Sequence, residues 1–344
     1  MKTQYANAVT QYENGTSLGG RIIKEGGLVV FPTETVYGLG ANGLNSEAVL
    51  KIFAAKGRPA DNPLILHIAK KSELKPLWSH VPDNARILAD TFWPGPLTMI
   101  FNRSSIVPDE VTAGLDTVAV RMPLNKTARA LINAAGVPIA APSANLSGKP
   151  SPTTAEHVRQ DMDGRVDLII DGGPCKYGLE STVVSLIGRP TILRPGAVTK
   201  EMLEAVIGPV DVAHAVLSPL REGETAASPG MKYRHYAPDA EVVVAEGRER
   251  DIAAKICREY DAREAAGEDC IIFATKQTQP FYRGRNCVII GDRTEPTTLC
   301  ASLFYSLREY GDRADVIFAE ALPNDDMGLA YMNRLLRSAG FNII

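Results

Sequence analysis

Apolar residues occur along this chain in two alternating patterns, short continuous runs and stretches with helical spacing. Residues 28–31 (LVVF) form a short apolar run after two glycines, which is typical of a buried strand. Residues 46–56 (SEAVLKIFAAK) place apolar side chains at helical spacing, with Asn45 or Ser46 available as an N-cap and Gly57 as the stop. The pattern therefore predicts a strand followed by an amphipathic helix.

The same alternation continues to about residue 210. The other strands expected are 64–68, 97–101, 118–121, 138–141, 167–170, 182–186 and 191–193, and the other helices are 83–92, 125–135 and 199–207. Strands that alternate with helices in this way are typical of an α/β fold with a largely buried sheet. We therefore expect an α/β domain over residues 1–210, with a mixed sheet.

Residues 211–238 interrupt this pattern. They contain turn formers such as Ser218-Pro219 and the segment 228–230 (SPG) and show no hydrophobic period, so we expect a linker. From residue 239 the alternation resumes, with strands at 242–245, 271–274, 287–290 and 316–319 and helices at 251–266, 297–310 and 328–339. This predicts a second, smaller Rossmann-like α/β domain over residues 239–344.

Charge is distributed unevenly between the two parts. The net charge is −3, but residues 1–210 hold 21 basic and 19 acidic residues, whereas the rest of the chain holds 16 and 21. An acidic sum disfavours binding of a nucleic-acid duplex through bulk charge, yet it leaves the first domain able to hold a small anion. The five cysteines form no C-x-x-C pair, and no apolar leader or membrane-length run is present, so we expect a reduced, cytoplasmic protein.

One glycine pattern resembles a dinucleotide-binding fingerprint in the wrong context. Residues 38–43 (GLGANG) match G-x-G-x-x-G, and Asp61 lies 18 residues beyond. In that fingerprint the first glycine directly follows a strand and the acidic residue ends the next one. Here six residues separate Phe31 from Gly38, and Asp61 precedes the next strand. NAD(P) binding is therefore disfavoured, and we expect a glycine-rich loop near a ligand instead.

A more specific signal comes from polar motifs at the ends of the expected strands. They are PTETVYGLG (32–40), KGRPADNPLILH (56–67), PGPLT (94–98), VAVRMP (118–123), PSANLSGKPSPT (142–153), ESTVV (180–184) and LRPG (193–196). In this order they resemble the YrdC-like threonylcarbamoyl-AMP synthase family. The segment SPGMKYRHYAP (228–238) before a small α/β domain resembles the longer, two-domain form of that family. The resemblance covers essentially the whole chain and implies a twisted mixed sheet with helices around a concave cavity.

The resemblance also implies a reaction. It is the ATP-dependent synthesis of L-threonylcarbamoyladenylate from L-threonine, bicarbonate and ATP, with release of pyrophosphate, and it supplies the threonylcarbamoyl group for a tRNA adenosine modification. The threonine amine is carboxylated first, and the carbamate oxygen then attacks the α-phosphate, so no enzyme nucleophile is needed. The sequence holds neither an H-E-x-x-H nor a Walker A motif. Catalysis is therefore expected to come from positioning and charge neutralisation.

Two cations follow the helix expected at 46–56. Lys56 and Arg58 flank Gly57, where that helix ends, so the loop can aim both side chains at one anion. By resemblance they are the catalytic residues that hold the triphosphate of ATP. Taken alone, this K-x-R pattern is more often two solvated charges at a helix C-terminus.

Further ATP contacts are expected at the ends of other strands. Ser143 and Asn145 follow the apolar strand at 138–141, and ligands of α/β sheets bind at such carboxyl ends. By resemblance Asn62, Ser151 and Arg194 also bind ATP, although a turn that caps the next helix would explain Ser151 equally well.

A second group of residues is expected to bind threonine. Arg121 ends the strand at 118–121, and the resemblance makes it a clamp on the threonine carboxylate, whereas a lone arginine there usually pairs with a protein carboxylate. For His67, which lies within a strand, a hydrogen-bonded core position and a threonine contact are equally open. The remaining threonine-binding residues implied by the resemblance are Thr35, Thr117, Ala141 and Ser181.

The linker segment 232–236 (KYRHY) combines positive charge with aromatic rings. A plain spacer needs no aromatic residues, so we prefer a flap that closes over ATP through His235 or Tyr236. Mg²⁺ is expected as the cofactor that accompanies ATP, held mostly by phosphate oxygens and water, and the sequence names no protein ligand for it.

Two other functions stay open at this point. An RNA-binding module would use a cationic cavity to hold a nucleic-acid backbone, but the acidic second domain and the lack of an aromatic RNA-binding run disfavour it. A carbamoyl-transfer enzyme that uses carbamoyl phosphate is disfavoured by the missing zinc-finger cysteines. The expected partners are ATP, L-threonine, bicarbonate and a downstream tRNA threonylcarbamoyl transferase. Direct contact with tRNA is left open, and no membrane partner is expected.

Overall fold

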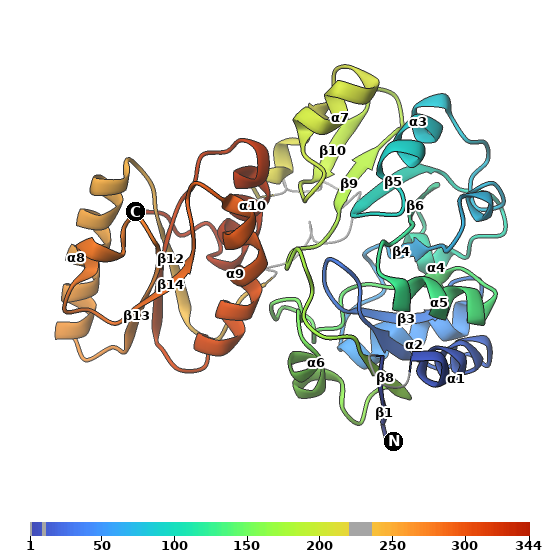
Figure 1. Cartoon of the computed structure of the whole chain (residues 1–344), viewed down its shortest axis with the longest axis horizontal. Coiled ribbons are helices and arrows are strands. Elements are labelled where there is room, and N and C mark those ends of the chain that lie inside the picture. Colours follow the sequence, from blue (N-terminus) through green and yellow to red (C-terminus); the bar gives the residue numbers. More distant parts are fainter. Residues whose placement is uncertain (1, 9–11, 220–235) are drawn as a thin grey trace. The chain divides into compact units, whose positions relative to one another are not determined.

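The computed structural model describes residues 2–8, 12–219 and 236–344. The described chain divides into two compact units, each with its own sheet and core (Figure 1). The first unit contains the described residues up to Pro219, apart from Gly148–Pro150, which belong to the second unit together with Tyr236–Ile344. His235 and the rest of the expected flap between residues 220 and 235 lie outside the described residues.

The first unit is built on a mixed sheet. Its strands are β1 (Gln4–Asn7), β2 (Val29–Phe31), β3 (Gly38–Asn42), β4 (Ile65–His67), β5 (Leu97–Asn102), β6 (Thr117–Arg121), β7 (Ile139–Ala140), β8 (Leu168–Asp171), β9 (Thr182–Ser185), β10 (Thr191–Arg194) and β11 (Asp211–Val212). They are arranged in the order β1-β8-β2-β3-β7-β4-β6-β5-β9-β10-β11. Parallel pairs such as β4 with β6 lie beside antiparallel pairs such as β5 with β6, which confirms the mixed sheet expected from the sequence.

Helices cover this sheet. They are α1 (Tyr12–Lys24), α2 (Ser46–Lys56), α3 (Asp83–Phe92), α4 (Asp109–Thr112), α5 (Lys126–Ala135), α6 (Ala155–Met162) and α7 (Lys200–Ile207), with short 3₁₀ turns η1 (Lys71–Leu74) and η2 (His214–Val216). Helix α2 has the bounds that the sequence predicts, because Asn45 caps its first turn and Gly57 ends it in the left-handed region at φ 60°. The Asn45 side chain accepts a hydrogen bond from the amide of Ala48.

The sequence analysis missed α1. Glycines at 15, 19 and 20 within α1 lower helix propensity and disguise its period. A Cβ at Gly20 would lie 2.5 Å from the Cβ of Ala134, so these glycines let α1 approach α5 closely. The letters GTSLG at 15–19 also match the G-x-S-x-G pattern of serine hydrolases, but they lie inside this helix and not on a strand-to-helix turn.

The expected glycine-rich loop near a ligand is instead strand β3, so this prediction was wrong. Gly38–Asn42 pairs antiparallel with β2, and Gly40 lies opposite Val29. A Cβ at Gly40 would lie 2.7 Å from Cγ2 of Ile139 and 2.8 Å from Cε1 of Phe31. The glycines are needed for close packing across the sheet and form no dinucleotide-binding turn.

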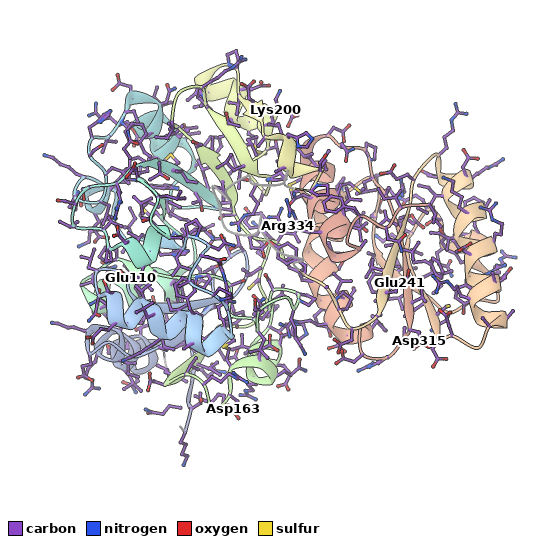
Figure 2. The ribbon with its side chains drawn as sticks, turned by 180° about the vertical axis from the view of Figure 1, so that it is seen from behind. Glu110, Asp163, Lys200, Glu241, Asp315 and Arg334 are labelled. Atoms are coloured by element: carbon purple, nitrogen blue, oxygen red, sulfur yellow. The ribbon has the colours of Figure 1, made fainter. Side chains whose placement is uncertain are left out.

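Residues 211–219, which the sequence assigned to the linker, continue the first unit. Strand β11 pairs parallel with β10, and Ala215 and Val216 in η2 are buried. Lys200, the first residue of α7, is labelled in Figure 2. The core of the unit lies on both faces of the sheet, with α2 and α3 packed over one face and α1 and α5 over the other.

The second unit has a parallel sheet, as predicted for a Rossmann-like domain. Its strands β12 (Glu241–Ala245), β13 (Cys270–Thr275), β14 (Cys287–Gly291) and β15 (Val316–Glu320) lie in the order β12-β15-β13-β14. Its helices are α8 (Glu249–Ala265), α9 (Pro296–Tyr310) and α10 (Asp326–Ser338), with a 3₁₀ turn η3 (Gln279–Tyr282). Glu241, where β12 begins, is labelled in Figure 2.

A buried ion pair lies at the carboxyl end of this second sheet. Nη1 of Arg293 lies 3.0 Å from Oε2 of Glu320, whose side chain is almost fully buried. The other carboxylate oxygen of Glu320 accepts hydrogen bonds from Tyr282 and Thr278. The described parts of the chain contain no helix that is both long and apolar enough to cross a membrane.

Candidate active site

A row of polar side chains crosses three neighbouring strands of the first sheet. In the parallel pair of β4 and β6, His67 lies opposite Arg121, and in the antiparallel pair of β6 and β5, Arg121 lies opposite Thr98. All three side chains are buried. The sheet register therefore joins two residues predicted to bind threonine and adds Thr98, which the sequence analysis did not single out.

The guanidinium of Arg121 is held from three sides. Its Nη2 lies 2.6 Å from Oε1 of Glu34, its Nη1 donates to Oγ1 of Thr35 at 2.9 Å, and its Nε donates to the carbonyl of Gly95 at 3.3 Å. The pairing with a protein carboxylate is therefore confirmed. Arg121 also contacts Thr35, another residue predicted to bind threonine, and the clamp on the threonine carboxylate stays a prediction.

Glu34 is the partner that the sequence analysis missed. Its second oxygen, Oε2, accepts hydrogen bonds from the backbone amides of Leu124 and Asn125, each at 3.0 Å. Burial alone would raise the pKa of Glu34, but the charge of Arg121 and these hydrogen bonds outweigh it, so the pKa lies below its usual value. Glu34 is therefore a buried carboxylate that stays ionised.

His67 is buried as a neutral ring. Its Nδ1 lies 3.1 Å from the carbonyl oxygen of Ile65, and a carbonyl only accepts, so Nδ1 carries the hydrogen. Burial lowers the pKa of His67 to about 3, with a further lowering from the nearby charge of Arg121. Nε2 of the neutral ring is left as an acceptor and not as a source of protons.

A second network lies next to this row. Oγ of Ser181 lies 2.7 Å from Oγ1 of Thr98, and Arg194 donates from Nε to the carbonyl of Ser181 at 3.0 Å and from Nη2 to its Oγ at 3.2 Å. Ser181 therefore connects a predicted ATP contact, Arg194, with the row of polar side chains on β4, β6 and β5.

Lys56 organises the loop that follows β7. Its Nζ donates to the carbonyls of Ser143 and Asn145, both at 2.6 Å, and Ser147 donates its amide back to the carbonyl of Lys56 at 3.0 Å. Oγ of Ser143 in turn donates to Oδ1 of Asn145 at 2.5 Å. The structure thus brings together three residues predicted to bind ATP, with the lysine charge directed at loop carbonyls.

Arg58 and Asn62 occupy one short turn after α2. Nη2 of Arg58 donates to the backbone carbonyl of Asn62 at 3.0 Å, and its guanidinium lies over the ring of Phe53. Asn62 is 0% exposed, yet within the described chain neither its side-chain nitrogen nor its oxygen has a hydrogen-bond partner. A buried amide without partners is costly, and a bound polar ligand would satisfy it.

Ser151 links the two groups of predicted residues. Its Oγ donates to Oε1 of Glu180 at 2.5 Å, and both side chains are buried. Glu180 directly precedes Ser181, the residue that contacts Arg194 and Thr98. Glu180 begins the motif ESTVV (180–184), and the sequence predicted no role for it.

Two predicted residues, Thr117 and Ala141, lie in the first unit but outside these networks. A third, Tyr236, lies in the second unit. Thr117 begins β6 at the end opposite Arg121, about 13 Å away at the usual rise of a strand. Ala141, just after β7, donates its amide to the carbonyl of Ile65 at 2.9 Å and so lies beside β4. Tyr236 belongs to the second unit, where its ring packs on that of Phe304 at 4.8 Å between centroids.

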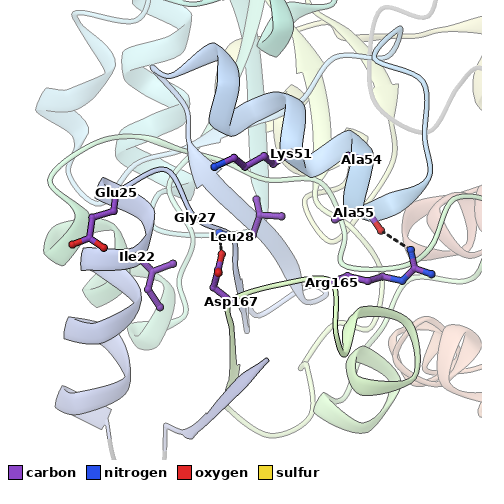
Figure 3. A pocket seen from close by; sticks show the side chains of 9 residues that line it. All are labelled: Ile22, Glu25, Gly27, Leu28, Lys51, Ala54, Ala55, Arg165 and Asp167. Atoms are coloured by element: carbon purple, nitrogen blue, oxygen red, sulfur yellow. Dashed lines mark hydrogen bonds between the residues drawn. The ribbon is translucent and has the colours of Figure 1, made fainter. Parts of the chain in front are cut away.

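A groove of about 560 Å³ on the first unit involves none of the predicted residues. Figure 3 shows its lining, in which Asp167 accepts from the amide of Leu28 and Arg165 reaches the carbonyl of Ala55. Leu28 and Asp167 lie just before β2 and β8, hence at the amino ends of these strands. Ligands of such sheets bind at carboxyl ends, so this groove is not our candidate site.

The missed residues have a common origin. Glu34, Thr98 and Glu180 all lie within motifs noted in the sequence, and Glu34 and Glu180 directly precede the predicted residues Thr35 and Ser181. A carboxylate next to a motif threonine or serine can therefore point to a further site residue, because a carboxylate that is buried requires a partner.

Two family models cover the chain. The model described as "Telomere recombination" (Sua5/YciO/YrdC) matches residues 21–196, and the model "Threonylcarbamoyl-AMP synthase, C-terminal domain" matches residues 198–340. Two relatives named threonylcarbamoyl-AMP synthase, from Bacillus subtilis and Pyrococcus abyssi, are 47% and 48% identical to it. Both alignments span 94% of this chain, with 92% and 93% of the relatives.

A solved structure is similar over the full length. It is the crystal structure of P. abyssi Sua5 complexed with L-threonine, with a TM-score of 0.93 and 44% identity, covering 100% of this chain and 99% of that chain. The similarity includes both units of the fold.

Proposed function

The chain belongs to the Sua5/YrdC family of threonylcarbamoyl-AMP synthases, and we propose that its connected polar networks bind L-threonine, bicarbonate and ATP. Its activity is the synthesis of threonylcarbamoyl-AMP, which serves the threonylcarbamoyl modification of tRNA. The observation that carries the proposal is that consecutive residues Glu180 and Ser181 connect the row around Arg121 with the residues expected to bind ATP.

The proposed chemistry has two steps. The threonine ammonium group first loses a proton. The neutral amine then attacks the carbon of bicarbonate, and a carbamate forms with loss of water. A carbamate oxygen then attacks the α-phosphorus of ATP, the bond from that phosphorus to the bridging oxygen breaks, and pyrophosphate leaves. The protein contributes orientation and positive charge to both steps and forms no covalent intermediate.

Threonine is proposed to bind at the row formed by β4, β6 and β5. The P. abyssi relative is described as complexed with L-threonine, which supports an amino-acid site in this fold. Arg121 offers a planar cation for the α-carboxylate, and the unprotonated Nε2 of His67 offers an acceptor for the amine. Thr35 supplies a hydroxyl group beside Arg121, and Ser181 supplies one beside Thr98.

ATP is proposed to bind beside the loop that Lys56 holds. Arg58 and Arg194 supply charge for the phosphates. The buried side-chain amide of Asn62 has no hydrogen-bond partner among the described residues, so it supplies a donor and an acceptor. Ser143, Asn145 and Ser151 add hydroxyl and amide groups.

The donor set fits Mg²⁺ that accompanies ATP. The described residues contain no group of three or more His, Cys, Asp or Glu side chains that could hold a metal by themselves. Mg²⁺ commonly takes its ligands from phosphates and water with one or two carboxylates. Glu180 is the carboxylate that contacts Ser151, one of the residues proposed to bind ATP, so it would be the protein ligand. Bound there with ATP, the ion would neutralise charge on the phosphates.

We also propose a cytoplasmic enzyme that hands its product to a separate tRNA threonylcarbamoyl transferase. All five cysteines of the chain are free thiols, which suits a reducing compartment. Direct contact with tRNA is not part of the proposal.

The proposal is tested by incubating the protein with L-threonine, bicarbonate, Mg²⁺ and ATP labelled at the α-phosphate. We expect a labelled adenylate and pyrophosphate only when threonine and bicarbonate are both present. Replacing bicarbonate by carbamoyl phosphate, as a control for a carbamoyl-transfer enzyme, is expected to give no adenylate. An adenylate that forms equally well without threonine would refute the assigned substrates.

A variant separates the ATP site from the threonine site. Arg58→Ala is expected to raise the KM for ATP by about tenfold or more, because one charge-assisted contact to phosphate is worth roughly 1.5–3 kcal/mol. The KM for threonine is expected to stay within about twofold. Omitting Mg²⁺ by chelation is expected to abolish turnover, and full activity in excess chelator would remove the ion from the proposal.

A further inference from the structure

Glu34 ties three separate segments of the first unit to one point. It lies in the loop after β2, its Oε1 pairs with Arg121 at the end of β6, and its Oε2 accepts the amides of Leu124 and Asn125 just before α5. Its own carbonyl accepts from the amide of Tyr177 at 2.9 Å. Such a carboxylate is fixed in position from both of its oxygens, and it fixes its arginine in turn.

The remaining donors of Arg121 indicate what this arrangement is for. A guanidinium has five N–H groups. Within the described residues, Gly95, Thr35 and Glu34 take one each from Nε, Nη1 and Nη2. One N–H is left on each terminal nitrogen. Two donors on neighbouring nitrogens match in number the two oxygens of a carboxylate.

The electrostatics of the pair point the same way. Arg121 is only 3% exposed, and an isolated cation at that depth would be strongly disfavoured. Glu34 neutralises it before any substrate binds, while the two backbone amides before α5 stabilise the negative charge of Glu34. The arginine can therefore stay buried, charged and oriented within the protein alone.

We propose that Glu34 is a positioning residue, which holds Arg121 so that its two remaining N–H groups meet the α-carboxylate of threonine. Glu34 itself does not touch the substrate. The inference rests on the proposed function, because it takes threonine as the ligand of Arg121. Glu34 would thus control selectivity for a free carboxylate through Arg121, without contacting the substrate.

The discriminating variant is Glu34→Gln. A glutamine has one accepting oxygen, so it can serve either Arg121 or the amides of Leu124 and Asn125, and its NH₂ group faces donors on the other side. The probes are L-threonine and L-threonine amide, which differ only in the carboxylate, titrated by calorimetry without ATP. We expect the wild-type protein to prefer threonine by about 10- to 100-fold, as for one charge-assisted bidentate contact.

In the Glu34→Gln variant we expect that preference to fall below about threefold. The loss is expected in threonine binding alone, with the affinity for threonine amide changed by less than about twofold, because the amide does not use the aligned charge. In turnover assays the KM for threonine rises and the KM for ATP does not. A merely structural role would instead weaken both probes together.

Glu320→Gln in the second unit is the matched control. It breaks a similarly buried arginine–glutamate pair in the other core. We expect it to lower thermal stability and to leave the preference for threonine over its amide unchanged. This separates the cost of a broken buried pair from the loss of alignment at Arg121.

Glu34→Asp keeps the experiment decisive if the glutamine variant does not fold. Aspartate retains the charge but is one methylene shorter, so it reaches Arg121 or the two amides but not both. We expect a preference for threonine between those of the wild type and the glutamine variant.

Three results separate the outcomes. If the wild-type protein binds threonine no better than the amide, the proposed contact between Arg121 and the carboxylate fails. If the wild type prefers threonine and Glu34→Gln keeps the full preference, Glu34 is not a positioning residue. Glu34→Asp decides the same question if the glutamine variant is insoluble. Equal weakening of both probes would assign Glu34 a structural role only and overturn the proposal.

Discussion

The neutral, buried ring of His67 makes the stability of the first unit depend on pH, and one substitution removes that dependence. In the folded unit the pKa of His67 is about 3, against an ordinary value of 6.5, because burial disfavours the charged ring. At about pH 8, well above the ordinary pKa, the ring is neutral in both the folded and the unfolded states and contributes no pH dependence.

As the pH falls below 6.5, the unfolded chain takes up a proton that the folded unit refuses until about pH 3. The unfolded state binds more protons in this window, so the free energy of unfolding decreases by up to about 1.4 kcal/mol per pH unit. At pH 5 the accumulated loss is about 2 kcal/mol relative to pH 8, which is a large part of the stability of an ordinary domain.

The assay compares the wild type with His67→Asn, whose amide nitrogen can replace Nδ1 as donor to Ile65. Both tryptophans of the chain, Trp78 and Trp93, are buried in the first unit, so urea titrations followed by tryptophan fluorescence report on this unit alone. Titrations at pH 5, 6, 7 and 8 give the free energy of unfolding as a function of pH. The wild type is expected to lose about 2 kcal/mol more than the variant between pH 8 and pH 5.

Other groups titrate identically in both proteins, so only the difference between their pH slopes measures His67. The carboxylate of Glu34, for example, adds its own acid dependence to both curves at lower pH. Parallel curves for the wild type and the variant between pH 5 and pH 7 would refute the reasoning. They would mean that the imidazole titrates alike in the folded and unfolded chains.

Three further predictions follow from contacts of the first unit. Lys56→Met keeps most of the side-chain length but removes the donor to the loop carbonyls, so the KM for ATP is expected to rise about tenfold or more in the labelled-ATP assay, and an unchanged value would contradict it. Arg121→Lys keeps the charge and loses the planar fork, so calorimetry is expected to show about 10- to 100-fold weaker threonine binding, with ATP binding as the control. Gly40→Ala places a Cβ against Ile139, so we expect the free energy of unfolding in urea to fall by about 1–3 kcal/mol. Gly57→Ala is the control: its added Cβ meets open space at φ 60°, and the expected loss is about 1 kcal/mol.

The regular elements were predictable wherever local signals agreed. Helix α2 has a cap, a period and a glycine stop in sequence order, and its predicted bounds are those of the structure. Strand β3 was missed because its glycines read as a loop, although the packing of Phe31 and Ile139 is what requires them. That requirement comes from residues distant in the sequence and leaves no local trace.

The sequence named residues for the candidate site but not the contacts between them. The family resemblance pointed to Thr35, Arg121 and Ser181, and their binding roles stay predictions. Which of them meet depends on register: β6 lies between β4 and β5, and this alone puts Arg121 between His67 and Thr98. Strand order in a mixed sheet is a long-range property, so no local pattern predicts it.

The buried pair of Arg121 and Glu34 shows why such long-range contacts matter for binding. Taking a guanidinium out of water is costly, and a site that did so only when threonine arrived would lose that energy from its affinity. Here the cost falls on folding, because Glu34, Thr35 and Gly95 already surround the cation in the protein alone. On our proposal, threonine then meets two N–H donors that are already buried and held in place. The stability that a buried ion pair costs relative to an apolar core would then be recovered as selectivity for a carboxylate.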